Sequence, residues 1–187
     1  MSEVNDRFRT QLNQVLTAIE MCRRDKLVLP LLVLLYSAMD IMASVCRAKS
    51  KPEVQRGDFT DWVDKFLLPE SKLPCTSEEL YGARCGLVHS LKAESSTSRR
   101  GTARPIAYAW GEGDCEALNT RIDDRKITTL VGVQIEDLLN AFGKAVTECF
   151  AAARKDSSLG ERMREHTAGL FDEYLIPPDK GKNIEKA

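Results

Sequence analysis

Residues 27–46 form a nearly unbroken apolar segment of twenty residues, and this segment constrains the fold more than any other. Its length is close to that of a membrane span, but a helix that is apolar on all sides is also what the centre of a helical bundle requires. The segment contains Asp40, and a carboxylate in the middle of a bilayer is costly. We therefore expect a buried core helix, with a membrane-anchored helical protein as the alternative that this segment leaves open.

The segments that flank this helix have a helical period. Apolar residues recur at helical spacing within residues 4–22 and 135–153, and more weakly within 160–175. A short helix that begins at Asp58 is indicated by an apolar stripe that consists of Phe59, Trp62, Val63, Phe66 and Leu67. Thr76 and Glu79 have the spacing of a capping box, which predicts a further helix start. The pattern predicts a mainly α protein, a bundle of about five or six helices.

The helical period is lost around residues 95–133, where we expect a small β or loop insertion. Residues 105–110 and 127–133 carry β-branched and aromatic side chains, which predict two short strands paired as a hairpin with a long loop. A chain of 187 residues is long enough for one domain with a real core. We expect that domain over residues 1–176, followed by a flexible charged tail at 177–187.

Composition excludes several classes of protein. A net charge of −1 argues against a protein that coats nucleic acid through bulk electrostatics, although a local basic site is compatible with it. The N-terminus lacks the pattern of a signal peptide, so we expect a cytoplasmic protein. Six cysteines without a CxxC pair, together with only two histidines, argue against a structural zinc site. We expect reduced, packed thiols, no metal and no cofactor.

The segment LYGARCGLVHS, residues 80–90, places a permanent cation and a histidine in a predicted helix. At about 100° per residue, Arg84 falls within the apolar stripe of this helix and His89 lies about 140° away from it. A guanidinium among packing residues costs free energy unless another group pairs with it. On spacing alone, an Arg84 that reaches the rim of the core and an exposed His89 are the alternative interpretation.

The run from Arg84 to His89 resembles the R-x4-6-H signature of the HEPN superfamily, and residues 31–47 are similar to the helix that precedes this motif in many members. The resemblance covers roughly residues 10–155 as an order of helices, although only the motif is specific. It implies a helical bundle that forms a homodimer, with two motifs facing each other across a cleft. In active members it implies a metal-independent endoribonuclease, often in toxin–antitoxin or phage-defence systems.

Two functions follow from this resemblance. The first is RNA cleavage by a toxin or phage-defence effector. In that case an antitoxin or a regulatory protein is the expected partner. The second is a non-catalytic module that binds a nucleotide or a partner protein, as other family members do. The residue after the arginine is often Asn, Asp or His in active members, and it is Cys85 here.

The residue types suit RNA cleavage without a metal. The ribose 2′-OH can attack the adjacent phosphate if an imidazole moves the proton and a guanidinium holds the developing charge. His89 is the predicted acid or base and Arg84 the predicted clamp, with Cys85 and Ser90 as supporting residues. DNA lacks the 2′-OH and would not be cut in this way. We expect residues 80–91 of two chains to meet, so that Arg84 and His89 of both line one groove.

Asp40 is a further supporting residue, because an unpaired carboxylate on an apolar helix is costly. Pairing with Arg84 or His89 would remove that cost, and a bond to backbone or to a tyrosine hydroxyl is an equal alternative. The stretch 92–110 contains a single carboxylate and has a net charge of +3, due to Lys92, Arg99, Arg100 and Arg104. It is either an RNA-binding loop, with Tyr108 or Trp110 available for stacking, or a solvated surface. His166 is expected at the surface.

Overall fold

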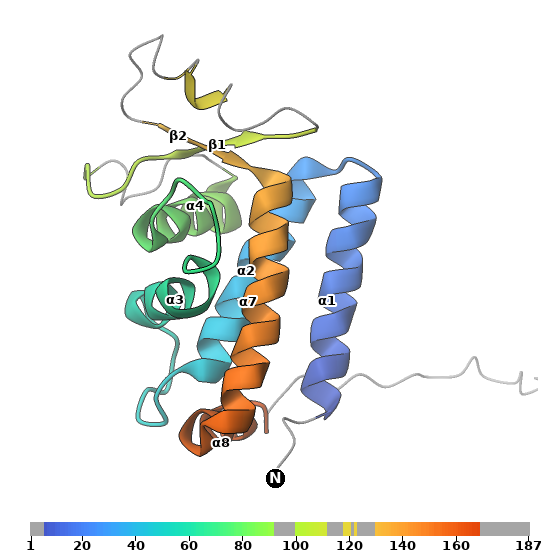
Figure 1. Ribbon diagram of the computed structural model, residues 1–187, viewed down its shortest axis with the longest axis vertical. Coiled ribbons are helices and arrows are strands. Elements are labelled where there is room, and N and C mark those ends of the chain that lie inside the picture. The colour runs from blue at the N-terminus through green and yellow to red at the C-terminus, as the bar shows by residue number, and fades with distance from the viewer. Residues whose placement is uncertain (1–5, 92–99, 112–117, 121, 123–129, 169–187) are drawn as a thin grey trace, which may run out of the picture.

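The computed structural model describes residues 6–91, 100–111, 118–120, 122 and 130–168. The protein is mainly helical, as the sequence predicts. Three long helices stand roughly upright, namely α1 (Asp6–Arg24), α2 (Val28–Cys46) and α7 (Ile135–Lys155) (Figure 1). The shorter α3 (Arg56–Trp62) and α4 (Ser77–Ser90) pack beside α2, and α8 (Ser157–His166) lies at the lower end.

The apolar segment of the sequence is the central helix of the bundle. Helix α2 contacts α1, α3, α4, α7 and α8. Its buried residues come from several sides of the helix and are Leu31, Leu32, Leu35, Tyr36, Ala38, Met39, Met42, Ala43 and Val45. Among the described residues it is the one helix long and apolar enough to cross a membrane, and half of its most apolar window is buried inside the protein. That burial matches the expected core helix.

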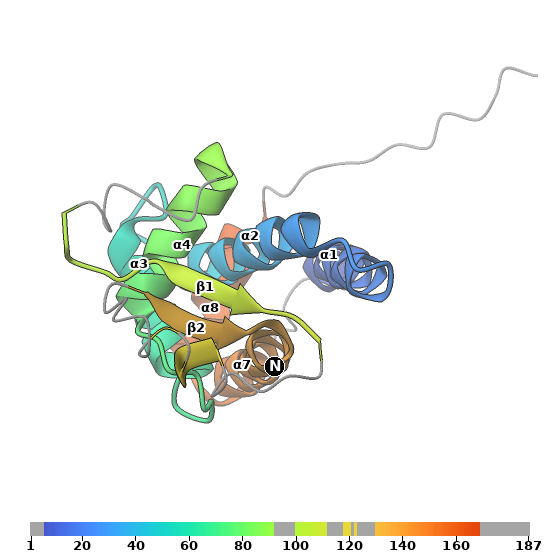
Figure 2. The same ribbon diagram turned by 90° about the horizontal axis from the view of Figure 1, so that it is seen from above.

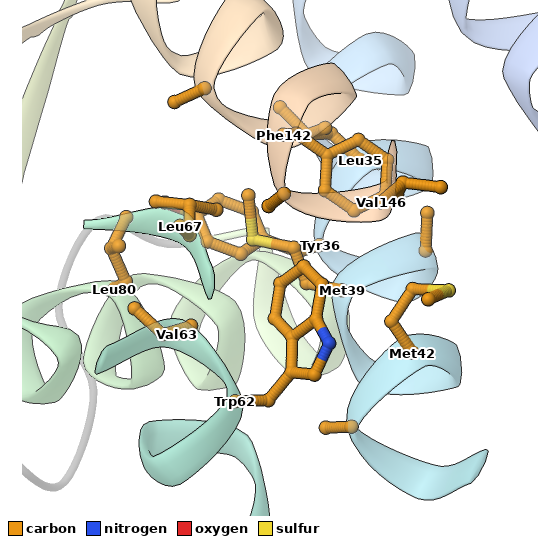
Figure 3. Packing of buried hydrophobic residues seen from close by; sticks show 14 of the residues in the cluster. Leu35, Tyr36, Met39, Met42, Trp62, Val63, Leu67, Leu80, Phe142 and Val146 are labelled. Atoms are coloured by element: carbon orange, nitrogen blue, oxygen red, sulfur yellow. The ribbon is translucent and has the colours of Figure 1, made fainter. Parts of the chain in front are cut away.

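The core lies between α2, α4, α7 and the helical segment at 56–67 (Figure 3). Figure 3 labels ten of its side chains, which are Leu35, Tyr36, Met39, Met42, Trp62, Val63, Leu67, Leu80, Phe142 and Val146. The predicted stripe of the short helix is confirmed, since all five of its apolar side chains are buried. Its predicted start is wrong by two residues, because the helix begins at Arg56 with Gln55 as N-cap, and Asp58 closes the capping box from the third position. The last turn, η1 (Val63–Leu67), is a π-helix.

The strands form a parallel pair, so the predicted hairpin is wrong. Strand β1 (Ile106–Ala109) pairs with β2 (Val131–Gln134), with Ile106 opposite Val131. Parallel strands need a crossover connection, and residues 110–130 supply it. In that connection Asn119 contacts β2, where the Gly132 N–H donates to Asn119 Oδ1 at 2.8 Å. The pair lies across one end of the helices (Figures 1 and 2).

The C-terminal helices agree with the sequence in position but differ in extent. Helix α7 covers the predicted amphipathic segment and ends at Lys155. The next residue, Asp156, caps α8, because its side chain accepts from the Ser158 and Leu159 N–H groups. Helix α8 begins at Ser157, three residues before the weaker apolar pattern, and ends at His166. The expected end of this helix at Leu175 and the predicted tail at 177–187 lie outside the described residues.

Candidate active site

Helix α4 carries the Arg84–His89 motif and begins at the predicted capping box. The Glu79 N–H donates to Thr76 Oγ1 at 3.2 Å, and the Thr76 N–H donates to Glu79 Oε2 at 2.9 Å. The helix continues without a break past Gly86 and ends at Ser90, where Leu91 adopts a left-handed conformation with φ 53°. The directions of residues 84 and 89 on this regular helix therefore differ by about 140°. The described part of the chain includes the backbone of His89 and Ser90 but not their side chains.

Arg84 forms an ion pair with Asp40 of α2. Arg84 Nε donates to Asp40 Oδ2 at 2.6 Å, and Nη2 contacts the same oxygen. Both side chains are 19% exposed, so the pair lies where the core meets solvent. Burial opposes the charge of Arg84, but the hydrogen bond and the charge of Asp40 raise the pKa of Arg84 above its usual value. The predicted pairing of Asp40 with Arg84 is thereby confirmed, in place of a bond to backbone or to a tyrosine.

The position of Arg84 on α4 differs from the one predicted by the helical wheel. The buried face of the helix is centred on Leu80, Ala83 and Leu87, whereas Arg84 lies at the edge of that face. A cation at the edge keeps part of its hydration, which lowers the cost of placing it against a core. Arg84 therefore lies at the rim of the core, as the alternative interpretation predicts. The ion pair with Asp40 holds it there.

Tyr81 and Cys85 share the partly exposed flank of α4 with Arg84. Arg84 Nη1 lies 3.9 Å from Cys85 Sγ. Burial raises the pKa of the Tyr81 hydroxyl, and its interaction with the Cys85 thiol raises that pKa further. The Tyr81 ring packs edge-on against Phe59 at 5.6 Å between centroids. Tyr81 was missed from the sequence, although its spacing of three residues from Arg84 places it on the same side of the helix.

Arg104, one of the residues predicted to bind RNA, has a structural partner. Arg104 Nε donates to Glu79 Oε1 at 2.6 Å, and the Glu79 side chain is only 6% exposed. Burial alone would raise the pKa of Glu79, but the bonds from Arg104 and from the Thr76 backbone lower it overall. Arg104 therefore anchors the start of β1 to the start of α4.

The other residues of the predicted RNA-binding loop are only partly described. Arg100 is exposed, and Lys92 and Arg99 lie outside the described residues. Tyr108, predicted to be available for stacking, is partly buried against the core, and its hydroxyl lies 2.6 Å from that of the fully buried Tyr36. Burial raises the pKa of Tyr108 well above its usual value. Trp110 is partly buried against the core.

The remaining polar residues do not form a metal site within the described part of the chain. No group of three or more His, Cys, Asp or Glu side chains there could hold a metal ion. His166, expected at the surface, is partly buried at the end of α8, and its Nε2 is enclosed without a hydrogen-bond partner.

Comparison with known proteins assigns no relative. No protein-family model matches the chain, and no curated protein or solved structure shows significant similarity to it. The resemblance to the HEPN superfamily stays a prediction from the Arg84–His89 motif. The function is therefore proposed from the residues and geometry of this chain.

Proposed function

We propose that the protein is a metal-independent endoribonuclease in which Arg84 and His89 act on the RNA backbone. The observation that supports this most is the Arg84–Asp40 ion pair at a partly exposed position on α4. Asp40 orients the guanidinium, and partial burial strengthens the interaction of this cation with an anion. In the backbone, residue 89 belongs to the last turn of α4, which ends at Ser90.

The chemistry divides between the two residues of the motif. An imidazole can gain or lose a proton near neutral pH, so we assign to His89 the transfer of the proton from the 2′-OH or to the leaving oxygen. Arg84 stabilises the charge that develops on the phosphate. The products would be a 2′,3′-cyclic phosphate and a 5′-hydroxyl, and no metal takes part in either step.

Cleavage of RNA in the presence of EDTA tests this proposal. Wild type should cut single-stranded RNA, and His89→Ala should be slower by about 10²–10⁴, the usual contribution of a general acid or base. His166→Gln is the matched control, because it changes the other of the two histidines, on α8, and should retain activity. An oligonucleotide with a single 2′-deoxy substitution should resist cutting at that position. Cleavage that survives in His89→Ala, or that requires Mg²⁺, would contradict the mechanism.

The active form that we propose is a homodimer. Positions 84 and 89 lie about 140° apart around one regular helix, so one chain does not easily focus both residues on the same phosphate. A two-fold axis would bring a second copy of each to the site. The two helices that carry the ion pair also carry partly exposed apolar side chains, among them Leu34 and Ile41 on α2 and Val88 on α4. Helices α2 and α4, which carry the ion pair, lie next to each other (Figure 2).

Light scattering at micromolar concentration tests the dimer. Wild type should have the mass of two chains, and Ile41→Glu should give a monomer with little cleavage, since a carboxylate would be buried in the interface. Leu29→Glu, at an exposed position near the start of the same helix, is the control and should stay dimeric. A wild type that is monomeric both free and with RNA would contradict the shared cleft.

The second function, a non-catalytic module that binds a nucleotide or a partner protein, is favoured by one observation. Asp40 neutralises Arg84 in the structure, and Cys85 contacts the same guanidinium. In that case the protein would bind RNA or nucleotide without cutting it, and His89→Ala would leave the binding unchanged.

A further inference from the structure

Two thiols from distant parts of the chain meet where α2 ends against α7. Cys46 is the last residue of α2 and Cys149 lies in the middle of α7, yet their Sγ atoms are 3.4 Å apart. Cys149 is fully buried, whereas Cys46 is partly exposed. The other thiols in the described part of the chain are Cys22, Cys75 and Cys85.

Cys46 lines a cavity of about 250 Å³ that opens to solvent. Lys65 and Arg162 also line it, as do Trp62 and Phe66. Arg162 Nε donates to the Cys46 carbonyl oxygen at 3.2 Å, which places a guanidinium beside the end of α2. Cys46 is therefore the residue of the pair that meets the cavity, whose lining carries the carboxylates Asp58 and Asp61 as well as cations.

The surroundings act on the ionisation of the pair in opposite directions, and burial raises the pKa of both thiols. The thiol–thiol hydrogen bond lowers the pKa of Cys149 and raises that of Cys46, so the Cys46 S–H donates and the negative charge resides first on Cys149. Lys65 lowers the pKa of both groups through its charge. The indole Nε1–H of Trp62 is buried without a hydrogen-bond acceptor in good geometry, and its proximity also lowers the pKa of Cys149. Electropositive, partly accessible thiols of this kind are the reactive ones in proteins.

We propose that Cys46 and Cys149 are a reversible redox pair that a small hydroperoxide oxidises to a disulfide through this cavity. The sulfurs have to approach by roughly 1.3 Å to reach a bond of about 2.05 Å. Cys46 ends its helix, and the next residue, Arg47, is already extended. The site does not use Arg84 or His89, so it is independent of the proposed RNA cleavage.

The reaction balances with hydrogen peroxide as the oxidant. The Cys46 sulfur attacks one peroxide oxygen as its proton passes to the Cys149 thiolate; an S–O bond forms, the O–O bond breaks and hydroxide leaves. Cys149 then attacks the Cys46 sulfenic acid, so that an S–S bond forms, the S–O bond breaks and the hydroxyl leaves as water with the Cys149 proton. Two thiols lose two electrons in total, and the peroxide is reduced to water and hydroxide.

Mass spectrometry of the full chain tests this proposal directly. The reduced, native protein is treated with hydrogen peroxide, alkylated, and digested without reductant. Two of the six thiols should become unavailable to the alkylating reagent, and one linked peptide should join Cys46 to Cys149 and disappear with dithiothreitol. Oxidation spread over other cysteines, or Cys46 oxidised to sulfinic acid with Cys149 still free, would overturn the proposal.

Two matched sets of variants sharpen the test. Cys46→Ser and Cys149→Ala should abolish the linked peptide, while Cys22→Ser and Cys85→Ser should retain it. Lys65→Met should slow disulfide formation at least threefold at neutral pH, because one cation near the sulfurs is lost, and Lys144→Met on the exposed face of α7 should not. Equal rates for the two lysine variants would contradict the role of the cavity. The wild-type linkage is informative even if a cysteine variant fails to fold.

Discussion

Two arginine–carboxylate pairs involve α4, and they differ in how their charges meet solvent. In the Arg104–Glu79 pair the carboxylate is 6% exposed and the arginine is 45% exposed. In the Arg84–Asp40 pair both side chains are 19% exposed. The first pair buries its anion and leaves its cation in water, whereas the second holds anion and cation at the same depth.

The hydrogen bonds of the two carboxylates explain this difference. Glu79 accepts from Arg104 and from the Thr76 N–H, so it closes a helix cap and ties β1 to α4. Asp40 meets both Arg84 nitrogens with a single oxygen and caps no helix in the bonds of the structure. An anion fixed by a cap is typical of a structural ion pair, whereas a guanidinium held by a carboxylate at the edge of the core suits recognition of a second anion such as phosphate.

Conservative replacement of the two arginines should separate these roles most strongly. Arg84→Lys keeps the charge but loses the planar fork, so RNA cleavage should fall at least tenfold, about 1.4 kcal/mol in transition-state stabilisation. Arg104→Lys should leave the cleavage rate within about twofold. Initial rates in EDTA measure both variants, with the midpoint of thermal unfolding as the check on folding. Equal losses of activity would mean that the two pairs do not differ in function.

Replacement of Asp40 tests whether the carboxylate orients Arg84. Asp40→Asn should lower cleavage several-fold and cost about 1–3 kcal/mol in the free energy of unfolding, because the guanidinium loses its charged partner while it is partly buried. The control is Asp64→Asn, at an exposed position in η1, which should change neither quantity measurably. Urea unfolding and the cleavage assay measure the two effects. Small and equal effects from both substitutions would contradict the orienting role.

The comparison also shows which parts of the site could be predicted from the sequence. The Arg84–Asp40 pair was one of the predicted alternatives, because a charge on an apolar helix face needs a partner. A bond from Asp40 to backbone or to a tyrosine hydroxyl was an equal prediction. Glu79 was recognised as a capping residue, but its partner was not, because Arg104 approaches from a segment whose path depends on the strand pairing.

Some features of the fold could likewise be predicted from the sequence, and others could not. The helices follow from a local period, and the central position of α2 follows from its apolar character on all sides. The hairpin was wrong because strand direction is set by the connection between the strands, and no turn motif marks that connection. The contact between Cys46 and Cys149 lacks any sequence signal, since 103 residues separate them and only the packing of α2 on α7 brings them together.

Loss of the Glu79 charge should lower the free energy of unfolding and change how that free energy depends on pH. The pKa of Glu79 is lowered in the folded protein, so its ion pair contributes stability above the unfolded pKa of about 4.3, and that contribution is lost as the pH falls through the folded pKa. Glu79→Gln should therefore be less stable than wild type by about 1–3 kcal/mol at pH 7, and the difference should shrink at lower pH. Urea unfolding between pH 7 and pH 3 measures it. A difference that stays constant with pH would mean that the charge of Glu79 adds nothing to its hydrogen bonds.

The smallest expected effect concerns the exposed Arg100 beside the paired Arg104. If the loop contacts RNA, Arg100→Ser should remove about one phosphate contact, and the slope of log affinity against log salt should become shallower by roughly 0.7 for a single strand. Arg104→Ser should weaken folding rather than this slope, because its guanidinium is already engaged by Glu79. Binding is measured with the His89→Ala protein, so that the RNA stays intact, at several salt concentrations. A slope unchanged by Arg100→Ser would mean that this part of the loop is solvated surface. A slope changed only by Arg104→Ser would mean that Arg104, rather than Arg100, contacts the RNA.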